Sequence, residues 1–494
     1  MALLQFQNVS FAYEGSYDPV FTDLSFQIDT DWRLGLIGRN GRGKTTLLRI
    51  LAGELAAQGQ VAVPLRPALF PFAAPGARAT AQEALIGFAP NEPAWRLLAE
   101  ATSLGLGAEL LSRPFDTLSR GEQTKLQLAA LFAREDAYPL IDEPTNHLDL
   151  QGRETVADYL SRKRGFLLVS HDRSFLNRCI THTLSLNRST VTVQRGDYDS
   201  WEREFERRNQ AEAARNQQLK KEIVRLKASA RKQADFSAKA EKGKFHVPES
   251  DVASMDRGYV GARAAALMKR SLATRAKIER DIEEREGLLH DAERVGVLKL
   301  SPLAHPKQRI VEVRGASVQY GDRVLLEGIA FSVSRGECVA LNGPNGCGKS
   351  SVLKSLCGLS DSLRGEVHIA GNLVISYVPQ STEHLRGELE RFIAETNADE
   401  TLFKAILRNM DFGRQQFNKD IGQYSEGQKK KLLIARSLCT PAHLYVWDEP
   451  LNYIDVFSRV QLEDLILAYR PTLLLVEHDR AFLERVCTRI IRLG

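Results

Sequence analysis

The sequence lacks the features of membrane and secreted proteins. It has no apolar run near 18 residues, so no membrane-spanning helix is expected. Its start, MALLQFQNVS, lacks the basic segment and the long apolar stretch of a secretory signal. Its six cysteines form no C-x-x-C pair, so we expect reduced thiols, mostly in the core, and a cytoplasmic location. The net charge of +5 is too small to identify a partner until it is located along the chain.

Two glycine-rich segments, 305 residues apart, are present instead and predict phosphate-binding loops. Both fit G-x-x-x-x-G-K-[ST], whose glycines let backbone N–H groups close around phosphate oxygens before a helix N-terminus. We expect Lys44 and Lys349 to reach the β- and γ-phosphates, and Thr45 and Ser350 to place a hydroxyl on Mg²⁺. The loops comprise Gly38, Arg39, Asn40, Gly41, Arg42, Gly43, Lys44 and Thr45, followed by Thr46, and Gly343, Pro344, Asn345, Gly346, Cys347, Gly348, Lys349 and Ser350, followed by Ser351.

The two halves of the chain repeat one order of motifs. From the loop lysine to the glycine of a serine-led motif is 77 and 78 residues, and from that glycine to an Asp-Glu pair is 21 in both halves. From the glutamate to a lone histidine is 28 and 29 residues. Such a repeat predicts two copies of one nucleotide-binding domain. These positions are Lys44, Gly121, Asp142, Glu143 and His171, and Lys349, Gly427, Asp448, Glu449 and His478.

Local patterns predict several helices and strands of the first copy. Residues 4–12 read as an opening strand with one slip of phase, and 77–115 reads as largely helical. Ser119, with Glu122 three residues later, predicts a capping box at a helix start. Pro139 removes a backbone donor from what should be a central strand, which the sequence leaves unexplained.

The organisation predicts ATP-binding domains at 1–198 and 306–494, with a linker at 199–305. Leu219, Ile223 and Leu226 follow helical spacing, and Gly243 and Pro248 interrupt the pattern. We therefore expect a helical hairpin with arms of about 35–40 residues, on the order of 50–60 Å long. An irregular tip is expected near 242–259.

The linker holds the positive charge. Residues 220–277 contain 15 Lys and Arg against 6 Asp and Glu, a net charge of +9, which leaves −4 for the remainder. A basic projecting hairpin suits an RNA backbone, to which attraction is electrostatic. The alternative from charge alone is a solvated coiled coil.

These motifs together resemble the ATP-binding cassette superfamily. Two cassettes on one chain, a basic helical linker and the motif Asp142-Glu143-Pro144-Thr145-Asn146-His147-Leu148-Asp149 resemble its F subfamily, whose members act in translation. The resemblance covers the whole chain. It implies two tandem α/β P-loop domains of the cassette type, joined by a long helical hairpin, in a monomer whose cassettes sandwich two ATP molecules head to tail.

The resemblance also implies residue roles. Aspartates hold Mg²⁺, glutamates deprotonate the attacking water, histidines contact the γ-phosphate, and tyrosines stack on adenine. Site one comprises Tyr13, Lys44, Thr45, Asp142, Glu143 and His171, closed by Ser425, Gly427 and Gln428. Site two comprises Tyr320, Lys349, Ser350, Gln380, Asp448, Glu449 and His478, closed by Ser119, Gly121 and Glu122. Gln380 is also expected at the metal; Phe72 stands in its place in the first half, so site one is expected to turn over differently. Because both glutamates are present, both sites are predicted to hydrolyse ATP.

The F-subfamily resemblance implies a partner. Its linker enters the ribosomal E site of the bacterial 70S particle and points at the P-site tRNA and the 23S rRNA of the peptidyl-transferase centre. A short cassette pair with a long linker resembles the antibiotic-resistance members that protect against lincosamides, streptogramin A and pleuromutilins. A housekeeping translation factor and a transporter ATPase subunit remain as alternatives, and a plain connector remains the alternative for the tip near 242–259. The tip residues expected at the ribosome are Lys242, Lys244, Phe245, His246, Val247, Pro248, Met255, Arg257 and Tyr259.

Overall fold

The computed structural model describes residues 2–14, 19–73, 79–146, 148–186, 191–243, 298–321, 323–396 and 398–493. Its contacts divide the chain into two units. One combines Met1–Trp201 with Val295–Gly494, and the other is Glu202–Arg294. The domain limits at 198 and 305 remain predictions.

The first half is built on a six-stranded sheet in the order β5-β6-β7-β3-β8-β9, parallel except for the last pair. The central strand β7, Phe-Leu-Leu-Val, is buried at every position, as expected of a parallel strand covered on both faces. A second, antiparallel sheet has the order β2-β1-β4. The strands are β1 Leu3–Phe11, β2 Phe21–Asp29, β3 Arg33–Gly38, β4 Gln58–Ala62, β5 Arg66–Phe70, β6 Ala137–Asp142, β7 Phe166–Val169, β8 His182–Leu186 and β9 Val191–Arg195.

The helices of the first half follow the sequence pattern. Three short helices occupy most of the described part of 77–115, which confirms the helical prediction there. The predicted capping box is present at the start of α5: Glu122 N–H donates to Ser119 Oγ, and Ser119 N–H donates to the Glu122 carboxylate. The helices are α1 Lys44–Leu51, α2 Ala81–Phe88, α3 Ala94–Ser103, α4 Ala108–Leu111, α5 Arg120–Ala133, α6 Leu150–Ser161 and α7 Arg173–Cys179, with a 3₁₀ turn, η1, at Phe115–Thr117.

The second half repeats this plan. Its parallel sheet has the order β14-β15-β16-β12-β17, and its antiparallel sheet the order β11-β10-β13. The strands are β10 Arg309–Tyr320, β11 Arg323–Ser334, β12 Cys338–Asn342, β13 Leu363–Ile369, β14 Ile375–Val378, β15 Leu444–Asp448, β16 Leu473–Val476 and β17 Arg489–Arg492. The helices are α10 Lys349–Leu356, α11 Leu389–Glu395, α12 Glu400–Asn409, α13 Glu426–Cys439, α14 Val456–Tyr469 and α15 Arg480–Val486, with 3₁₀ turns η3 Arg414–Asn418 and η4 Ile421–Gln423.

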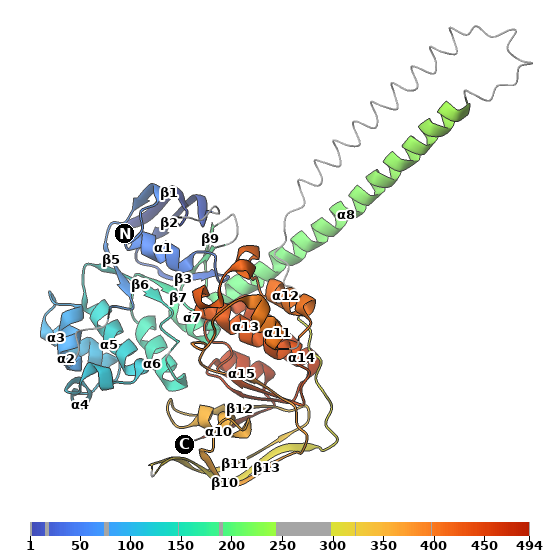
Figure 1. The fold of residues 1–494 in the computed structure, drawn as a ribbon. Coiled ribbons are helices and arrows are strands. Elements are labelled where there is room, and N and C mark those ends of the chain that lie inside the picture. Colours follow the sequence, from blue (N-terminus) through green and yellow to red (C-terminus); the bar gives the residue numbers. More distant parts are fainter. Residues whose placement is uncertain are drawn as a thin grey trace, which may run out of the picture. The chain divides into compact units, whose positions relative to one another are not determined.

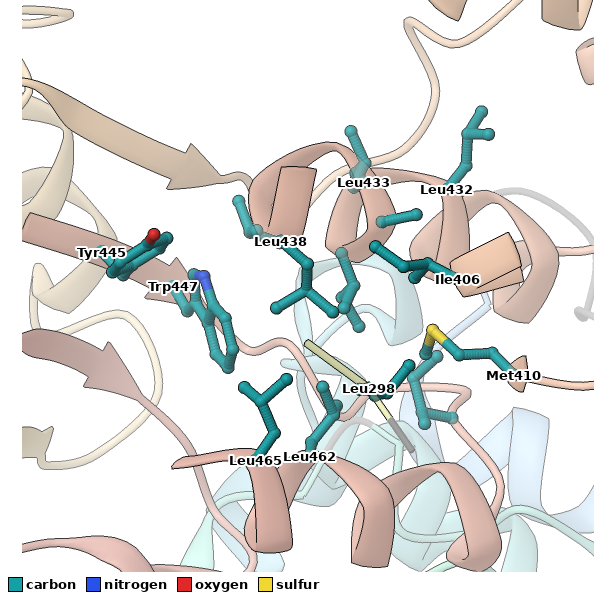
Figure 2. Close-up of a cluster of buried hydrophobic side chains, with 14 of the residues drawn as sticks. Leu298, Ile406, Met410, Leu432, Leu433, Leu438, Tyr445, Trp447, Leu462 and Leu465 are labelled. Carbon is teal, nitrogen blue, oxygen red and sulfur yellow. The ribbon is translucent and has the colours of Figure 1, made fainter. Parts of the chain in front are cut away.

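A hydrophobic core on one face of the second parallel sheet fixes its helices. Leu432, Leu433 and Leu438 of α13 meet Trp447 of β15, and Ile406 of α12 packs into the same cluster (Figure 2). Leu298, which lies inside the predicted linker range 199–305, joins this core and anchors that part of the chain to the second half. A separate core on the other face joins the sheet to α10 and the antiparallel strands.

Two sequence irregularities have structural explanations. The predicted slip of phase in the first strand is a register shift between Phe6 and Val9 in β1, with Asn8 at φ 49°. Pro139 pairs with Ala68 of β5, whereas the ladder from β6 to β7 begins only at Leu140. At the matching place in the second half, the N–H of Tyr445 donates to Thr472 O at 2.9 Å. The proline therefore removes one hydrogen bond at the end of a ladder and leaves its centre intact.

The first arm of the predicted hairpin is α8, one helix of 46 residues at Tyr198–Gly243 (Figure 1). At 1.5 Å per residue it is about 70 Å long, longer than the predicted arm. The described part of this helix runs to Gly243. The second arm and the tip residues after Lys242 lie outside the described residues, as does His147. In the described part of the chain, no helix is long and apolar enough to cross a membrane.

Candidate active sites

Both glycine-rich segments form loops between a buried strand and a helix. β3 leads into the first loop and α1, and β12 leads into the second loop and α10. The N-cap residues Gly43 and Gly348 have φ of 86° and 105°, a conformation that residues with a side chain rarely adopt. These glycines let the loop reverse direction directly into the helix. The first N–H groups of the helix then point at the space in which such loops bind phosphate.

The two loop lysines take the same pose. Lys44 Nζ donates to the carbonyls of Gly38 at 2.7 Å and Arg39 at 3.1 Å. Lys349 Nζ donates to the equivalent carbonyls of Gly343 and Pro344, both at 2.8 Å. Both ammonium groups are therefore held over their own loops. The predicted role of the lysines at the β- and γ-phosphates fits this placement.

A hydroxyl and a carboxylate meet beside each loop. Thr45 Oγ1 donates to Asp142 Oδ2 at 2.8 Å, and Ser350 Oγ donates to Asp448 Oδ1 at 3.1 Å. Asp448 Oδ2 is buried and accepts no hydrogen bond from the described chain. Burial raises the pKa of Asp448 to about 6, because the hydrogen bond from Ser350 and the charges of Lys430 and Lys354 offset only part of the lost hydration. One carboxylate and one hydroxyl suit Mg²⁺, which keeps water and substrate phosphates as its other ligands.

A glutamate and a histidine face each other in both sites. His171 Nε2 lies 3.3 Å from Glu143 Oε1, and His478 Nε2 lies 3.8 Å from Glu449 Oε1. Glu143 and Glu449 have φ of 49° and 46°, and each N–H donates across to the neighbouring strand at 2.9 Å. This strained backbone turns each glutamate side chain out of its strand end toward the histidine.

Burial sets the charge of these pairs. Burial, together with nearby Asp142, raises the pKa of Glu143 to about 8. Burial lowers the pKa of His478 to about 3, and it holds the pKa of His171 well below its usual range with help from Lys44. Both histidines are therefore neutral at pH 7 and can donate one N–H. In its ionised form Glu143 is therefore a stronger base than an exposed carboxylate, which suits a group that accepts a proton from water.

The first phosphate loop also touches the second half of the chain. Asn40 Nδ2 donates to Tyr453 O at 2.7 Å. A Cβ at Gly427 would stand 2.5 Å from that same oxygen and 2.9 Å from Asn40 Nδ2, so any side chain at Gly427 would break this contact. Loop one and the serine-led motif of the other half are thus in direct contact, which is the pairing that the sequence predicted for site one.

The two serine-led motifs are built alike. Ser425 caps α13 by accepting from Gln428 N–H at 3.3 Å, just as Ser119 caps α5. The first turn of α5 is exposed or half-buried, whereas Gly427 in the first turn of α13 is buried. The assignment of Ser119, Gly121 and Glu122 to site two remains a prediction.

Both predicted adenine-stacking tyrosines bond to the residue that follows the loop. Tyr13 Oη lies 2.9 Å from Thr46 Oγ1, and Tyr320 Oη lies 2.8 Å from Ser351 Oγ. The two tyrosines are 43% and 52% exposed, so a base can approach them from solvent. Stacking remains a prediction that this placement favours.

The position of the expected glutamine differs between halves. Gln380 is exposed just after β14. Phe72 instead packs against Phe88, with centroids 5.3 Å apart, and under the guanidinium of Arg134 at 4.9 Å. An aromatic ring bound into the helices of the first half cannot ligate a metal. This supports the prediction that site one differs from site two.

Sequence reasoning missed several residues around site one. Lys431 Nζ is buried and donates to Asp455 Oδ2 at 2.7 Å, and Asp411 lies 3.2 Å from the predicted loop residue Arg42. Lys430 is buried beside them in α13. No local signal marks Lys430 or Lys431 as buried, because a helix can keep three consecutive side chains in solvent directly before a core residue such as Leu432.

One known protein family matches both halves of the chain. The family model described as ABC transporter matches residues 21–146 and 326–452, together about half of the chain. The chain belongs to the ATP-binding cassette family. It is a P-loop ATPase with two cassettes, and its relatives place it in the F subfamily.

Several curated cassette proteins match almost the full chain. The ribosome protection protein VmlR of Bacillus subtilis is 29% identical, covering 97% of this chain and 84% of that one. The ATP-binding protein Uup of Caulobacter vibrioides is 30% identical, with 96% and 75% covered. The energy-dependent translational throttle protein EttA of Haemophilus influenzae is 25% identical, with 96% and 89% covered.

Solved structures share the cassette fold. The archaeal ribosome recycling factor aABCE1, solved in complex with the ribosomal stalk protein aP1, superposes with a TM-score of 0.62 at 18% identity. That match covers 98% of this chain and 87% of that chain. A structure titled RNase-L Inhibitor gives a TM-score of 0.60 at 19% identity. At these identities the likeness is one of fold.

Proposed function

We propose that this cassette ATPase is a ribosome-binding factor that protects the bacterial 70S ribosome from antibiotics. The observation that carries the proposal is the segment between the cassettes. It contains α8, a helix of 46 residues, and the stretch 220–277 with its net charge of +9. A transporter subunit has no use for such an element, whereas an RNA backbone attracts it electrostatically. The relatives VmlR and EttA are named for roles at the ribosome and in translation.

The chemistry of each site supports an ATP-driven clamp. Glu143 and Glu449 accept a proton from the attacking water, and His171 and His478 donate an N–H to the γ-phosphate. Mg²⁺, held beside Thr45 with Asp142 or Ser350 with Asp448, neutralises phosphate charge when bound.

ATP joins the two cassettes because each site takes residues from both. ATP binding therefore favours the closed sandwich, in which the linker takes its ribosome-bound pose. Hydrolysis removes the γ-phosphate contacts, so the sandwich opens and the protein leaves the ribosome. The linker tip would reach the 23S rRNA and P-site tRNA near the peptidyl-transferase centre and displace drug there.

A housekeeping translation factor is the second candidate. EttA and Uup each match 96% of this chain, and nothing in the ATP sites separates the two roles. The tip sequence decides between them, because only those residues would reach the drug site.

Two measurements test the proposal. The Glu143→Gln, Glu449→Gln protein should co-sediment with 70S ribosomes in ATP and lose binding steeply as salt rises. Failure to bind at moderate salt would overturn the ribosomal role altogether. Drug susceptibility with and without the gene separates the candidates: protection supports resistance, and unchanged susceptibility with intact binding supports the housekeeping role.

A further inference from the structure

Lys430 is a buried amine between the two ATP sites. It lies in α13 and is 1% exposed. Its Nζ donates to three backbone carbonyls, those of Pro379 at 2.9 Å, Gln380 at 3.2 Å and Asp448 at 3.2 Å. An ammonium has three N–H donors, so all three are used. The carbonyls lie at the ends of β14 and β15, which carry the predicted metal ligands of site two.

Core packing alone does not require an amine at this position. A methionine of similar length would fill the volume without the cost of burying a charge. That cost is visible: burial lowers the pKa of Lys430 to about 8, although Asp448, Glu477 and Glu449 favour the charged form. The amine therefore makes a specific connection rather than filling space.

The first half has no such connection. Thr124 stands five residues after the N-cap Ser119, as Lys430 stands five after Ser425. Thr124 Oγ1 donates only within its own helix, to Arg120 O at 2.9 Å. The N–H of Phe72 instead donates to Gln127 Oε1 at 2.9 Å. Lys430 therefore occurs in the half of the chain that has Gln380, where the first half has Phe72.

The same helix reaches the other site. Its N-terminal residue Gly427 lies against Asn40 of the first phosphate loop, three residues before Lys430. Any shift of α13 that follows closure at site one is passed by Lys430 to the backbone of Gln380 and Asp448. Asp448 is then held by its carbonyl and by Ser350, while Oδ2 stays available to a ligand.

We propose that Lys430 is a positioning residue that couples closure of site one to the alignment of Gln380 and Asp448 in site two. This rests on the proposed assignment of both sites. The first half lacks this lysine, and its helix α5 instead reaches the segment after β5 through Gln127, which accepts from the N–H of Phe72.

The kinetic test isolates site two in a Glu143→Gln background. Lys430→Met should lower site-two kcat by about 10–100-fold, as loss of groups that orient metal ligands does, with ATP KM changed less than about threefold. Lys430→Thr copies the residue that the equivalent helix α5 carries as Thr124. It should lower site-two kcat in the same way as Lys430→Met. Thr124→Val is the matched control and should leave kcat unchanged.

A double-mutant cycle tests the coupling itself. Asn40→Ala should lower site-two kcat at least about fivefold when Lys430 is present and have no further effect in the Lys430→Met protein. Additive losses would overturn the proposal, and so would an unchanged kcat in both Lys430 variants.

Hydrogen exchange gives a readout that does not depend on turnover. In the doubly Gln-substituted protein, ATP should slow exchange of the amides at 380–382, and Lys430→Met should abolish that slowing. Equal protection in both proteins would contradict a positioning role. If the Glu143→Gln protein with Lys430 intact shows no turnover, the assignment of site two fails, while this exchange experiment still decides the role of Lys430.

Discussion

Arg42 of the first phosphate loop forms an ion pair with Asp411 of the second cassette, Nη2 to Oδ2 at 3.2 Å. Next to it, the guanidinium of Arg39 lies 5.1 Å from the ring centroid of Phe457, also in the second cassette. The second loop has Cys347 and Pro344 at the matching places. Loop one therefore carries charged contacts across the cassette interface that the second loop's side chains cannot form.

Breaking this ion pair should weaken the closing of the sandwich. Arg42→Ala and Asp411→Ala should each raise the ATP concentration needed for ribosome binding. Because the pair is partly exposed, a double-mutant cycle should give a coupling energy of about 0.2–1 kcal/mol. The exchanged pair Arg42→Asp with Asp411→Arg should recover part of the loss. Strictly additive single effects would show that the two residues do not interact in the closed form.

Removing the ammonium beside Asp455 should destabilise the second cassette in a pH-dependent way. Burial alone would raise the pKa of Asp455, but Lys431 outweighs it and holds the pKa well below its usual range. This stability is present above the unfolded pKa near 4 and is lost as pH falls. Lys431→Met should cost about 3–5 kcal/mol at pH 7, because a buried carboxylate loses its partner.

The pH dependence of the stability loss in Lys431→Met identifies its cause. Without the cation, burial favours protonated Asp455, so the deficit should shrink between pH 7 and pH 5 in denaturant unfolding. Lys404→Met, which breaks an exposed pair with Glu400, is the control and should cost less than about 1 kcal/mol at both pH values. A deficit at Lys431 independent of pH would point to lost packing instead.

Phe72 should matter for stability rather than for catalysis. Its ring packs against Phe88 and Arg134, so Phe72→Ala should lower the free energy of unfolding of the first cassette by about 1.5–3 kcal/mol. Site-one turnover in a Glu449→Gln background should stay within about threefold, since the ring cannot ligate a metal. A loss of turnover as large as that from Glu143→Gln would show that the ring acts in catalysis.

Replacing both glutamates should stop turnover while leaving ATP bound. Glu143→Gln with Glu449→Gln should lower phosphate release by about 10²–10⁴-fold, the usual contribution of a general base. Each single variant should retain turnover at the other site. ATP affinity, measured by equilibrium dialysis, should change little, because the phosphate loops are untouched. Unchanged phosphate release in the double variant would refute both assignments.

The sequence by itself determined the two copies, their motifs and the charged linker. Loop, strand-end and cap motifs depend on residues close in the chain, so spacing alone predicted α1, the capping box of α5 and the strand ending at Asp142.

Only the tertiary structure decided which distant residues meet. Nothing along the chain shows that Asn40 touches Tyr453, that Lys431 holds Asp455, or that Lys430 joins the ends of β14 and β15. The three adjacent lysines look like a solvated run in sequence, and two are buried because α13 packs into the core at Leu432 and Leu433. Contacts of this kind depend on how helices and sheets pack, and packing is set by many residues at once rather than by any local pattern.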